Sequence, residues 1–442
     1  MTSQSVSNHS DEQRLPTISR VAGDTIVELV YDPERKQTGL VVSRFGGLWN
    51  IEQEVRVGAG EVLVPYGASN NLIAHECVLF ASKPEHHGDK DTLLSDIEGY
   101  LERYVVLSPV FLRMAAHYIL LSWVYDAFNE LPYLRLQGDY GTGKTRGLLA
   151  IGLISYKPFF ASGASTVSPL FHILDVFGGT LVCDEADFRF SDATSELVKI
   201  LNNGTMSGLP VLRTMQNRHK ELNPRAFRVF GPKVLAMRGG YQDEALESRF
   251  LTENMNLQRM HAGIPIHLPA EMRAEALTLR NKLLHFRLCT LFDTKIDPSL
   301  ASPDLEPRFN QIALPLLSVV ADAGLRSDIE AHIVRQQKGG AGLRSRELSV
   351  ALIAVIQEAF REESIRSISI RDLTDRLNAR LGNGSSYTTK QIARQMRRHL
   401  GVSIHKSDGI HVFARSELTV INEIAKRFRV PDIVDTHTPS ET

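Results

Sequence analysis

The octapeptide Gly138-Asp139-Tyr140-Gly141-Thr142-Gly143-Lys144-Thr145 decides the fold of this chain. It matches G-x-x-x-x-G-K-[ST] at every constrained position, after the strand-like run 133–137 and before the helical run 145–153. Such a loop wraps phosphates, because successive N–H groups and the positive end of the helix face the anion. In this pattern Lys144 reaches the β- and γ-phosphates and the Thr145 hydroxyl binds Mg²⁺. The sequence therefore predicts a nucleotide-binding α/β core.

Two carboxylates stand at the end of the second strand-like run of the core. The apolar run 180–183 stops at Asp184 and Glu185, about 40 residues after Lys144, which leaves room for one helix and one strand. We expect Asp184 to order the Mg²⁺ shell and Glu185 to orient and polarise the attacking water. The pair predicts hydrolysis of the nucleotide as well as binding.

Bulk composition limits the class of protein. The 442 residues carry a net charge of -1, so any basic surface has to be local. The three cysteines are far apart and form no C-x-x-C pair, which argues against a disulfide framework and fits a reducing cytoplasm. The longest apolar run, 105–127, is interrupted by charged residues and predicts a buried helix and no membrane span. We expect a cytoplasmic protein.

Periodicity divides the chain into segments. Alternating strand-like and helical runs in the core indicate a parallel sheet that is covered on both faces. The expected segments are a tail (1–15), a β-rich N-terminal domain (16–88), a helical connector (89–131), the ATPase core (132–268), a helical lid (269–337), a glycine-rich flexible joint (338–342), a C-terminal unit (343–430) and a second tail (431–442).

A basic connector separates two β-like runs inside the core. The runs 209–215 and 225–230 flank Arg218, His219 and Lys220 and precede the strand-like run 233–237. They predict a hairpin, for which an ordinary solvated tip is the alternative to a functional one. Glu244-Ala-Leu-Glu-Ser-Arg-Phe250 then follows.

The order of these motifs resembles the AAA+ ATPases of the helicase clade with a pre-sensor-1 hairpin, which includes the minichromosome-maintenance helicases. It is more closely similar to the smaller helicase-like ATPases of plasmids, phages and genomic islands. The resemblance covers 132–287 and rests on Phe230-Gly-Pro-Lys-Val-Leu-Ala236 followed by Glu244–Phe250. It implies ATP and Mg²⁺ as cofactors, and a homo-hexameric ring in which Arg249 is the arginine finger for the neighbouring subunit.

The resemblance also implies how the remaining basic residues act. The hairpin tip at Arg218, His219 and Lys220 would contact single-stranded DNA in a central channel. Arg238 is the candidate sensor, at a position where the minichromosome-maintenance pattern has asparagine. Arg280 is the candidate second sensor in the lid, with Arg273 and Arg287 as alternatives.

The C-terminal unit has the element order of a winged helix-turn-helix. A helix over 390–400 precedes two short strand-like runs that are joined at 408–409. The unit holds 16 Lys and Arg against 9 Asp and Glu. The helix carries Lys390, Arg394, Arg397 and Arg398, which suit the major groove of duplex DNA. A protein-interaction module is the alternative.

Together these features predict an ATP-driven ring-forming DNA helicase or replication-initiation ATPase of a bacterial mobile element. Two alternatives stay open. One is a AAA+ switch or loader that remodels a protein partner on DNA without unwinding it. The other is an interaction protein whose winged helix grips a partner while the ATPase times assembly. The N-terminal domain could bind origin DNA, a primase or a neighbouring protomer.

Overall fold

The computed structural model describes fourteen stretches of the chain, which fall in two compact units, Met1–Gln336 (unit 1) and Gln337–Thr442 (unit 2). The described residues are 13–44, 47–57, 60–162, 165–184, 186, 192–216, 222–241, 243–257, 263–339, 341–362, 364–381, 387–398, 400–407 and 409–428.

A five-stranded parallel sheet forms the centre of unit 1, in the order β14-β8-β13-β10-β9. The predicted parallel sheet is therefore confirmed. Strand β13 lies between β8, which leads to the octapeptide, and β10, which leads to Asp184. The strands are β8 (Tyr133–Gln137), β9 (Phe159–Ala161), β10 (Leu181–Cys183), β13 (Lys233–Met237) and β14 (Phe250–Asn254).

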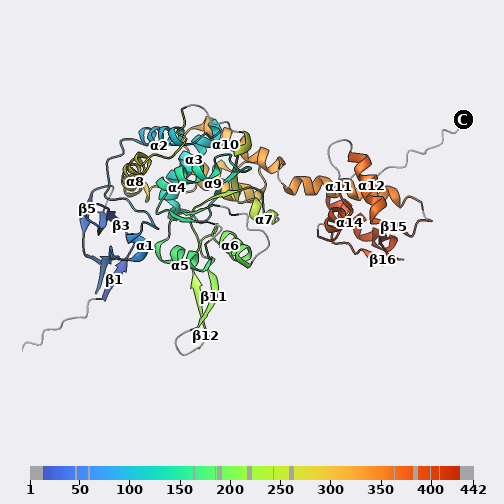
Figure 1. The fold of residues 1–442 in the computed structure, drawn as a ribbon, viewed down its shortest axis with the longest axis horizontal. Coiled ribbons are helices and arrows are strands. Elements are labelled where there is room, and N and C mark those ends of the chain that lie inside the picture. The colour runs from blue at the N-terminus through green and yellow to red at the C-terminus, as the bar shows by residue number, and fades with distance from the viewer. Residues whose placement is uncertain are drawn as a thin grey trace, which may run out of the picture. The chain divides into compact units, whose positions relative to one another are not determined.

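Helices cover both faces of this sheet (Figure 1). Alternate strand side chains point to opposite faces, so Leu134 and Leu136 join one apolar core while Tyr133 joins the other. The first core holds α2 (Lys90–Tyr104), α3 (Pro109–Trp123), α4 (Lys144–Ile154), α8 (Glu271–Thr290), α9 (Pro307–Val319) and α10 (Ala323–Gly339). The second holds α5 (Ser168–Phe177) and α6 (Asp192–Asn203).

Helix α3 is buried along most of its length, as its apolar sequence predicted. Among the described residues, no helix is both long and apolar enough to cross a bilayer. Short elements complete unit 1: α1 (Asn71–Ala74), α7 (Glu244–Glu247) and three single turns of 3-10 helix, η1 (Tyr125–Ala127), η2 (Met255–Leu257) and η3 (Pro298–Leu300).

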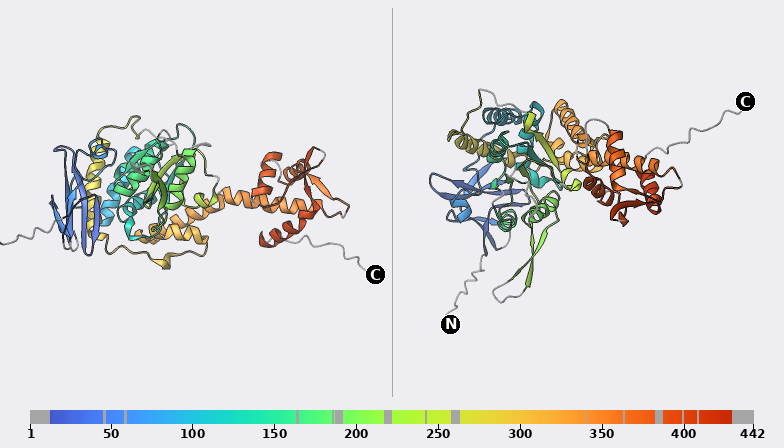
Figure 2. Two further views of the ribbon diagram at one scale, coloured as in Figure 1. Left: turned by 90° about the horizontal axis from the view of Figure 1, so that it is seen from below. Right: turned by 45° about the vertical axis from the view of Figure 1, so that its right-hand side comes forward.

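The N-terminal strands form two small sheets in the same compact unit as the central sheet. Four antiparallel strands have the order β2-β3-β4-β5, and a second sheet has the order β1-β7-β6. The bounds are β1 (Gln13–Thr17), β2 (Ser19–Ala22), β3 (Thr25–Asp32), β4 (Gln37–Arg44), β5 (Trp49–Glu52), β6 (Val55–Val57) and β7 (Glu61–Pro65). Strand β3 and helix α8 lie side by side (Figure 2).

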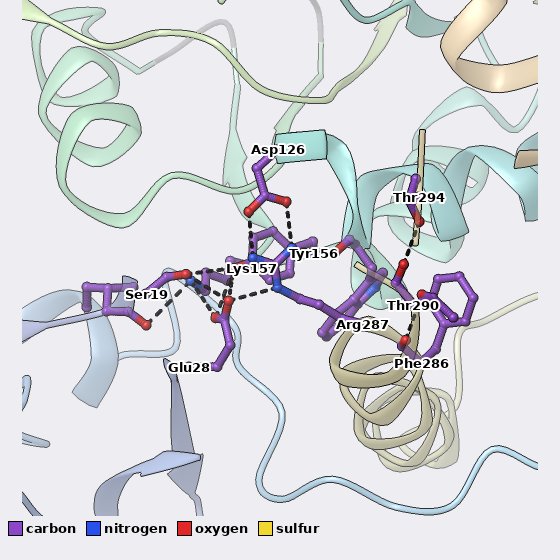
Figure 3. Close-up of polar contacts among 11 residues, drawn as sticks. Ser19, Glu28, Asp126, Tyr156, Lys157, Phe286, Arg287, Thr290 and Thr294 are labelled. Atoms are coloured by element: carbon purple, nitrogen blue, oxygen red, sulfur yellow. Dashed lines mark hydrogen bonds and ion pairs between the residues drawn. The ribbon is translucent and has the colours of Figure 1, made fainter. Parts of the chain in front are cut away.

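A buried charged cluster joins β3, α8 and the central domain (Figure 3). Glu28 is 1% exposed and accepts Nζ of Lys157 at 2.9 Å and Nε of Arg287 at 2.8 Å. The Tyr156 hydroxyl donates to the same carboxylate at 2.7 Å. Burial opposes the ionisation of Glu28, but Lys157 and Arg287 outweigh it and lower the pKa of this carboxyl.

The guanidinium of Arg287 also binds Asp126 through two parallel contacts of 2.7 Å, Nη1 to Oδ1 and Nη2 to Oδ2. The cluster of Glu28, Lys157, Arg287 and Asp126 thus holds two charges of each sign. Because its members come from four separate elements or loops, it fixes the N-terminal strands to the domain around the central sheet.

Unit 2 packs helices and a small sheet around its own apolar core. The antiparallel sheet has the order β15-β17-β16. Its elements are α11 (Ala341–Ala359), β15 (Ser367–Ser369), α12 (Ile370–Leu381), α13 (Thr389–Arg398), β16 (His405–Ser407), β17 (Ile410–Ala414), η4 (Arg415–Glu417) and α14 (Leu418–Phe428). The hydroxyl of Thr388 accepts N–H of Gln391 at the start of α13 and so caps this helix.

The predicted flexible joint at 338–342 follows directly after the boundary between the two units, and its described residues are helical. Helix α10 continues to Gly339 and α11 begins at Ala341. Gly339 is the last residue of α10 and Gly342 the second of α11, so neither lies in a helix interior, where a glycine costs about 1 kcal/mol relative to alanine. Gly340 lies outside the described residues.

Candidate functional site

The octapeptide forms a tight loop between β8 and α4. Gly141 and Gly143 have φ of 78° and 87°, values that residues with a side chain rarely adopt, and α4 begins immediately afterwards at Lys144. The first amide groups of α4 therefore point out of the loop without partners in their own helix. The loop therefore has the left-handed glycines and the helix start that the motif predicted.

Bonds within the loop hold its shape. Nζ of Lys144 donates to the carbonyl of Asp139 at 2.5 Å, and the Thr142 hydroxyl donates to the same carbonyl at 2.9 Å. Tyr140 is 90% exposed. The ammonium of Lys144 thus lies over the loop, in a position to meet a bound phosphate.

Asn256 is a site residue that sequence reasoning missed. Its Oδ1 accepts N–H of Asp139 at 2.7 Å, and its Nδ2 donates to Oδ2 of Asp139 at 3.1 Å. Asn256 lies in η2, just beyond β14, and β14 pairs with β8. The signal that could have found it is its place after a strand that ends at the same sheet edge as β8.

Thr145 and Asp184 meet across the sheet edge. The Thr145 hydroxyl donates to Oδ2 of Asp184 at 2.7 Å, although 39 residues separate the two. Both supply the hard oxygen ligands that Mg²⁺ prefers, and Mg²⁺ sites of this kind need only one or two protein oxygens beside phosphates and water. The pair therefore fits a Mg²⁺ ion. Glu185, the expected catalytic carboxylate, lies outside the described residues.

Arg238 follows β13 at the same edge. Met237 pairs with Gln137, and the Met237 carbonyl accepts N–H of Gly138 at 3.3 Å. Arg238 is exposed. The backbone of Arg238, the candidate sensor, therefore lies next to Gly138, the first residue of the phosphate loop.

Arg249 lies at the opposite end of the strands. Its carbonyl accepts N–H of Tyr133, the first residue of β8, whereas the phosphate loop follows the last. Five residues of strand separate these points, about 16 Å at the usual rise. Arg249 is half-buried and donates to Oδ1 of Asn202. Burial lowers the pKa of this guanidinium, and nearby Arg308 lowers it further.

Two of the arginines suggested for the lid face elsewhere. Arg280 is buried and donates to the carbonyls of Phe80 at 3.0 Å and Leu153 at 2.6 Å. Arg287 is fully buried in the charged cluster. In this structure both bind the protein interior, so the expectation that Arg280 contacts the nucleotide is corrected. Their helix, α8, is buried on several sides, which its sequence did not reveal.

The predicted hairpin is present as β11 (Val211–Gln216) and β12 (Leu222–Phe227), which pair antiparallel. It projects from the side of unit 1 that carries α5 and α6 (Figure 2). Asp175 of α5 binds Arg225 and Arg228 at the base of the hairpin, each at 3.3 Å. The tip, with Arg218, His219 and Lys220, lies outside the described residues.

In unit 2, α13 presents basic side chains on one side. Lys390, Arg394 and Arg397 are exposed, whereas Ile392 and Met396 are buried in the core. The exposed positions follow the i, i+4, i+7 spacing of one helix face. The Arg398 side chain is not among those described. The helix therefore displays the basic face that its sequence predicted.

Comparisons with known proteins return helicase structures. The C-terminal region of NrS-1 is 13% identical over 88% of this chain and 96% of its own, with a TM-score of 0.35. Cch of SCCmec type IV, described as an active helicase, is 11% identical over 92% and 96%, with a TM-score of 0.34. A full-length MCM homolog from Methanopyrus kandleri is 13% identical over 72% and 74%, with a TM-score of 0.36.

This chain is similar to MCM-like helicase structures. No family model matches the chain, and no curated protein matches it in sequence.

Proposed function

We propose that this chain is an ATP-driven DNA helicase or replication-initiation ATPase that works as a ring. The observation that carries the proposal is the contact between Thr145 and Asp184, at 2.7 Å, beside a complete phosphate loop. Lys144 and the start of α4 would bind the phosphates. Bound Mg²⁺ would neutralise charge on the β- and γ-phosphates. Glu185, the next residue, is the proposed base that orients water.

The separation of Arg249 from its own loop supports a shared site. The backbone of Arg249 lies about 16 Å from the phosphate loop of its own subunit, and its guanidinium is bonded to Asn202, so it is poorly placed to stabilise charge on phosphates held there. It can do so for a neighbour, as arginine fingers do when they act in trans. The ring, of which a homo-hexamer is the expected form, follows from this assignment.

The hairpin and α13 supply the proposed DNA contacts. The tip residues would follow the backbone of a single strand by charge, without reading sequence. The exposed face of α13, in the proposed winged helix-turn-helix, would enter the major groove of a duplex. The resemblance noted from the sequence is the basis for proposing a mobile-element origin.

A strand-displacement assay on a forked duplex tests the proposal. The wild-type chain with ATP and Mg²⁺ is expected to separate the strands and to hydrolyse ATP faster with single-stranded DNA. Lys144→Ala is the matched control, which should lose both activities and keep its fold. Hydrolysis without strand separation would favour the alternative, a AAA+ switch or loader. An absence of hydrolysis would refute both.

A further inference from the structure

Helix α6 contacts both the hairpin and Arg249, two parts of unit 1 that the proposed motor has to coordinate. It follows β10 and the acidic pair in sequence, and it leads to the hairpin. Leu197, Ile200 and Leu201 bury its inner face in the second core. Its outer residues contact the hairpin and Arg249, as described next.

The C-terminal end of α6 is anchored. The Tyr133 hydroxyl donates to the carbonyl of Leu201 at 3.0 Å, and Nζ of buried Lys233 donates to that of Gly204 at 3.3 Å. A Cβ at Gly204 would overlap Nζ of Lys233 and lie 2.5 Å from the carbonyl oxygen of Val229. This end of the helix is therefore held against β8 and β13.

Within this anchored end, one residue past Leu201, Asn202 holds Arg249. Its Oδ1 accepts the guanidinium, and its Nδ2 donates to Oδ2 of Asp243 at 3.4 Å. Arg249 has to leave this partner if it is to reach a phosphate of a neighbouring subunit. The contact with Asn202 is thus a resting position for Arg249.

In the middle of α6, Glu196 holds the hairpin. Its Oε2 lies 3.0 Å from Nη2 of Arg213, on β11. Within the described residues, Glu196 Oε2 and Arg213 Nη1 are buried without an aligned hydrogen bond. The contact is therefore mainly Coulombic. Coulombic attraction weakens gradually as the two groups move apart, whereas a hydrogen bond is lost over a short distance.

We infer that α6 is a lever between the shared ATP site and the hairpin, with Asn202 and Glu196 as positioning residues. The inference rests on the proposed function. Loss of the contact between Arg249 and Asn202 removes one restraint at the anchored end, about which the rest of the helix can then turn. Glu196 lies six residues from Asn202, about 9 Å along the helix, so a small rotation moves the hairpin base further than Asn202 itself.

The test compares Asn202→Ala with Asn203→Ala. Asn203 is the matched control, because its Nδ2 donates within the helix, to the carbonyl of Lys199 at 2.9 Å. ATP hydrolysis is measured with and without single-stranded DNA. Asn202→Ala is expected to raise the rate without DNA and to reduce the stimulation by DNA about fivefold. Asn203→Ala should match the wild type in both.

A second variant, Glu196→Gln, keeps the side-chain shape and removes the charge that faces Arg213. It is expected to reduce DNA stimulation without raising the rate in the absence of DNA. Because both residues act through one helix, the double variant should lose no more stimulation than the stronger single variant. Additive losses would overturn the lever, and thermal melting confirms that each variant is folded.

The possible results distinguish failure of the lever from failure of the proposed function. If DNA stimulates the wild type and Asn202→Ala behaves like Asn203→Ala, the lever is overturned and the helicase proposal stands. If DNA does not stimulate the wild type, the proposed function fails and the lever fails with it. A fall in stimulation for Asn202→Ala, with no fall for Asn203→Ala, supports the lever.

Discussion

Arg287→Met removes one positive charge from the buried cluster and leaves Glu28 and Asp126 with only Lys157. Arg287 has no exposed side-chain surface and makes contacts of 2.7 to 2.8 Å with Glu28, Asp126 and the carbonyl of Trp123. Methionine fills a similar volume with an apolar chain. The substitution therefore isolates the loss of the charge and its hydrogen bonds.

The expected cost follows from burial. Removing one partner of a buried ion pair costs about 3–5 kcal/mol, because a charge is left in a poorly solvated site. Asp126 keeps 33% of its side-chain surface exposed, whereas Glu28 keeps 1%. Water can solvate part of the unpaired charge at Asp126, so we expect the lower end, about 3 kcal/mol, in the free energy of unfolding.

The loss of stability in Arg287→Met should depend on pH. In the wild type, Arg287 lowers the pKa of both carboxyls against the opposing effect of burial. Their stabilisation is therefore complete at neutral pH and lost as the pH falls below their lowered pKa values. In the variant, the unpaired carboxylate takes up a proton more readily. The difference between variant and wild type is expected to be largest at pH 7 and smaller at pH 5.

Urea unfolding at pH 7 and pH 5 measures both effects. Trp123 is a built-in probe, because its ring lies 5.2 Å from that of Tyr156 and its carbonyl accepts Arg287. Trp49, the second tryptophan, is changed to phenylalanine in all samples. Arg113→Met is the matched control, since Arg113 pairs with Asp322 at an exposed site and should cost under about 1 kcal/mol. The reasoning would be refuted if Arg287→Met and Arg113→Met lost equal free energy of unfolding. It would also be refuted if the loss in Arg287→Met were the same at pH 7 and pH 5.

Three further outcomes are expected. Asp184→Asn should still bind ATP, measured by equilibrium titration, but hydrolyse it about a hundredfold more slowly, because the carboxylate charge beside Thr145 is gone. Asn256→Ala should raise KM for ATP about tenfold with little change in kcat in steady-state assays, because Asp139 loses two hydrogen bonds. Burial lowers the pKa of Lys233 from 10.5 to about 7, so the unfolded chain binds the proton that the folded chain releases above pH 7. The wild type should therefore gain about 2 kcal/mol of stability between pH 7 and pH 9 in urea titrations, and Lys233→Met should lack that gain.

The loop and the acidic residue were predictable because their chemistry is local. Two glycines at fixed spacing impose the turn, and a carboxylate after an apolar run marks a strand end. The meeting of Thr145 with Asp184 followed once both were assigned to the same sheet edge. Asn256 escaped because its role depends on the pairing of β14 with β8, and no pattern within one segment encodes strand order.

The arginines of α8 show why other assignments failed. Sequence spacing places Arg280 and Arg287 on a helix but does not say what surrounds that helix. The structure covers α8 with the N-terminal strands, so both guanidiniums bind partners more than a hundred residues away. An arginine that would be exposed on an isolated helix is buried in the folded unit, where it bonds to distant parts of the chain.

The contact between Glu28 and Arg287 spans 259 residues of chain. At ordinary rates of synthesis, 5–20 residues per second, roughly 10–50 s pass between the emergence of the two side chains from the ribosome. Throughout that interval the carboxylate of Glu28 lacks its guanidinium, and the nascent N-terminal strands have no α8 to cover them. Completion of this part of the fold is therefore tied to late translation, and a nascent chain halted before α8 should present exposed strands to chaperones or to other nascent chains.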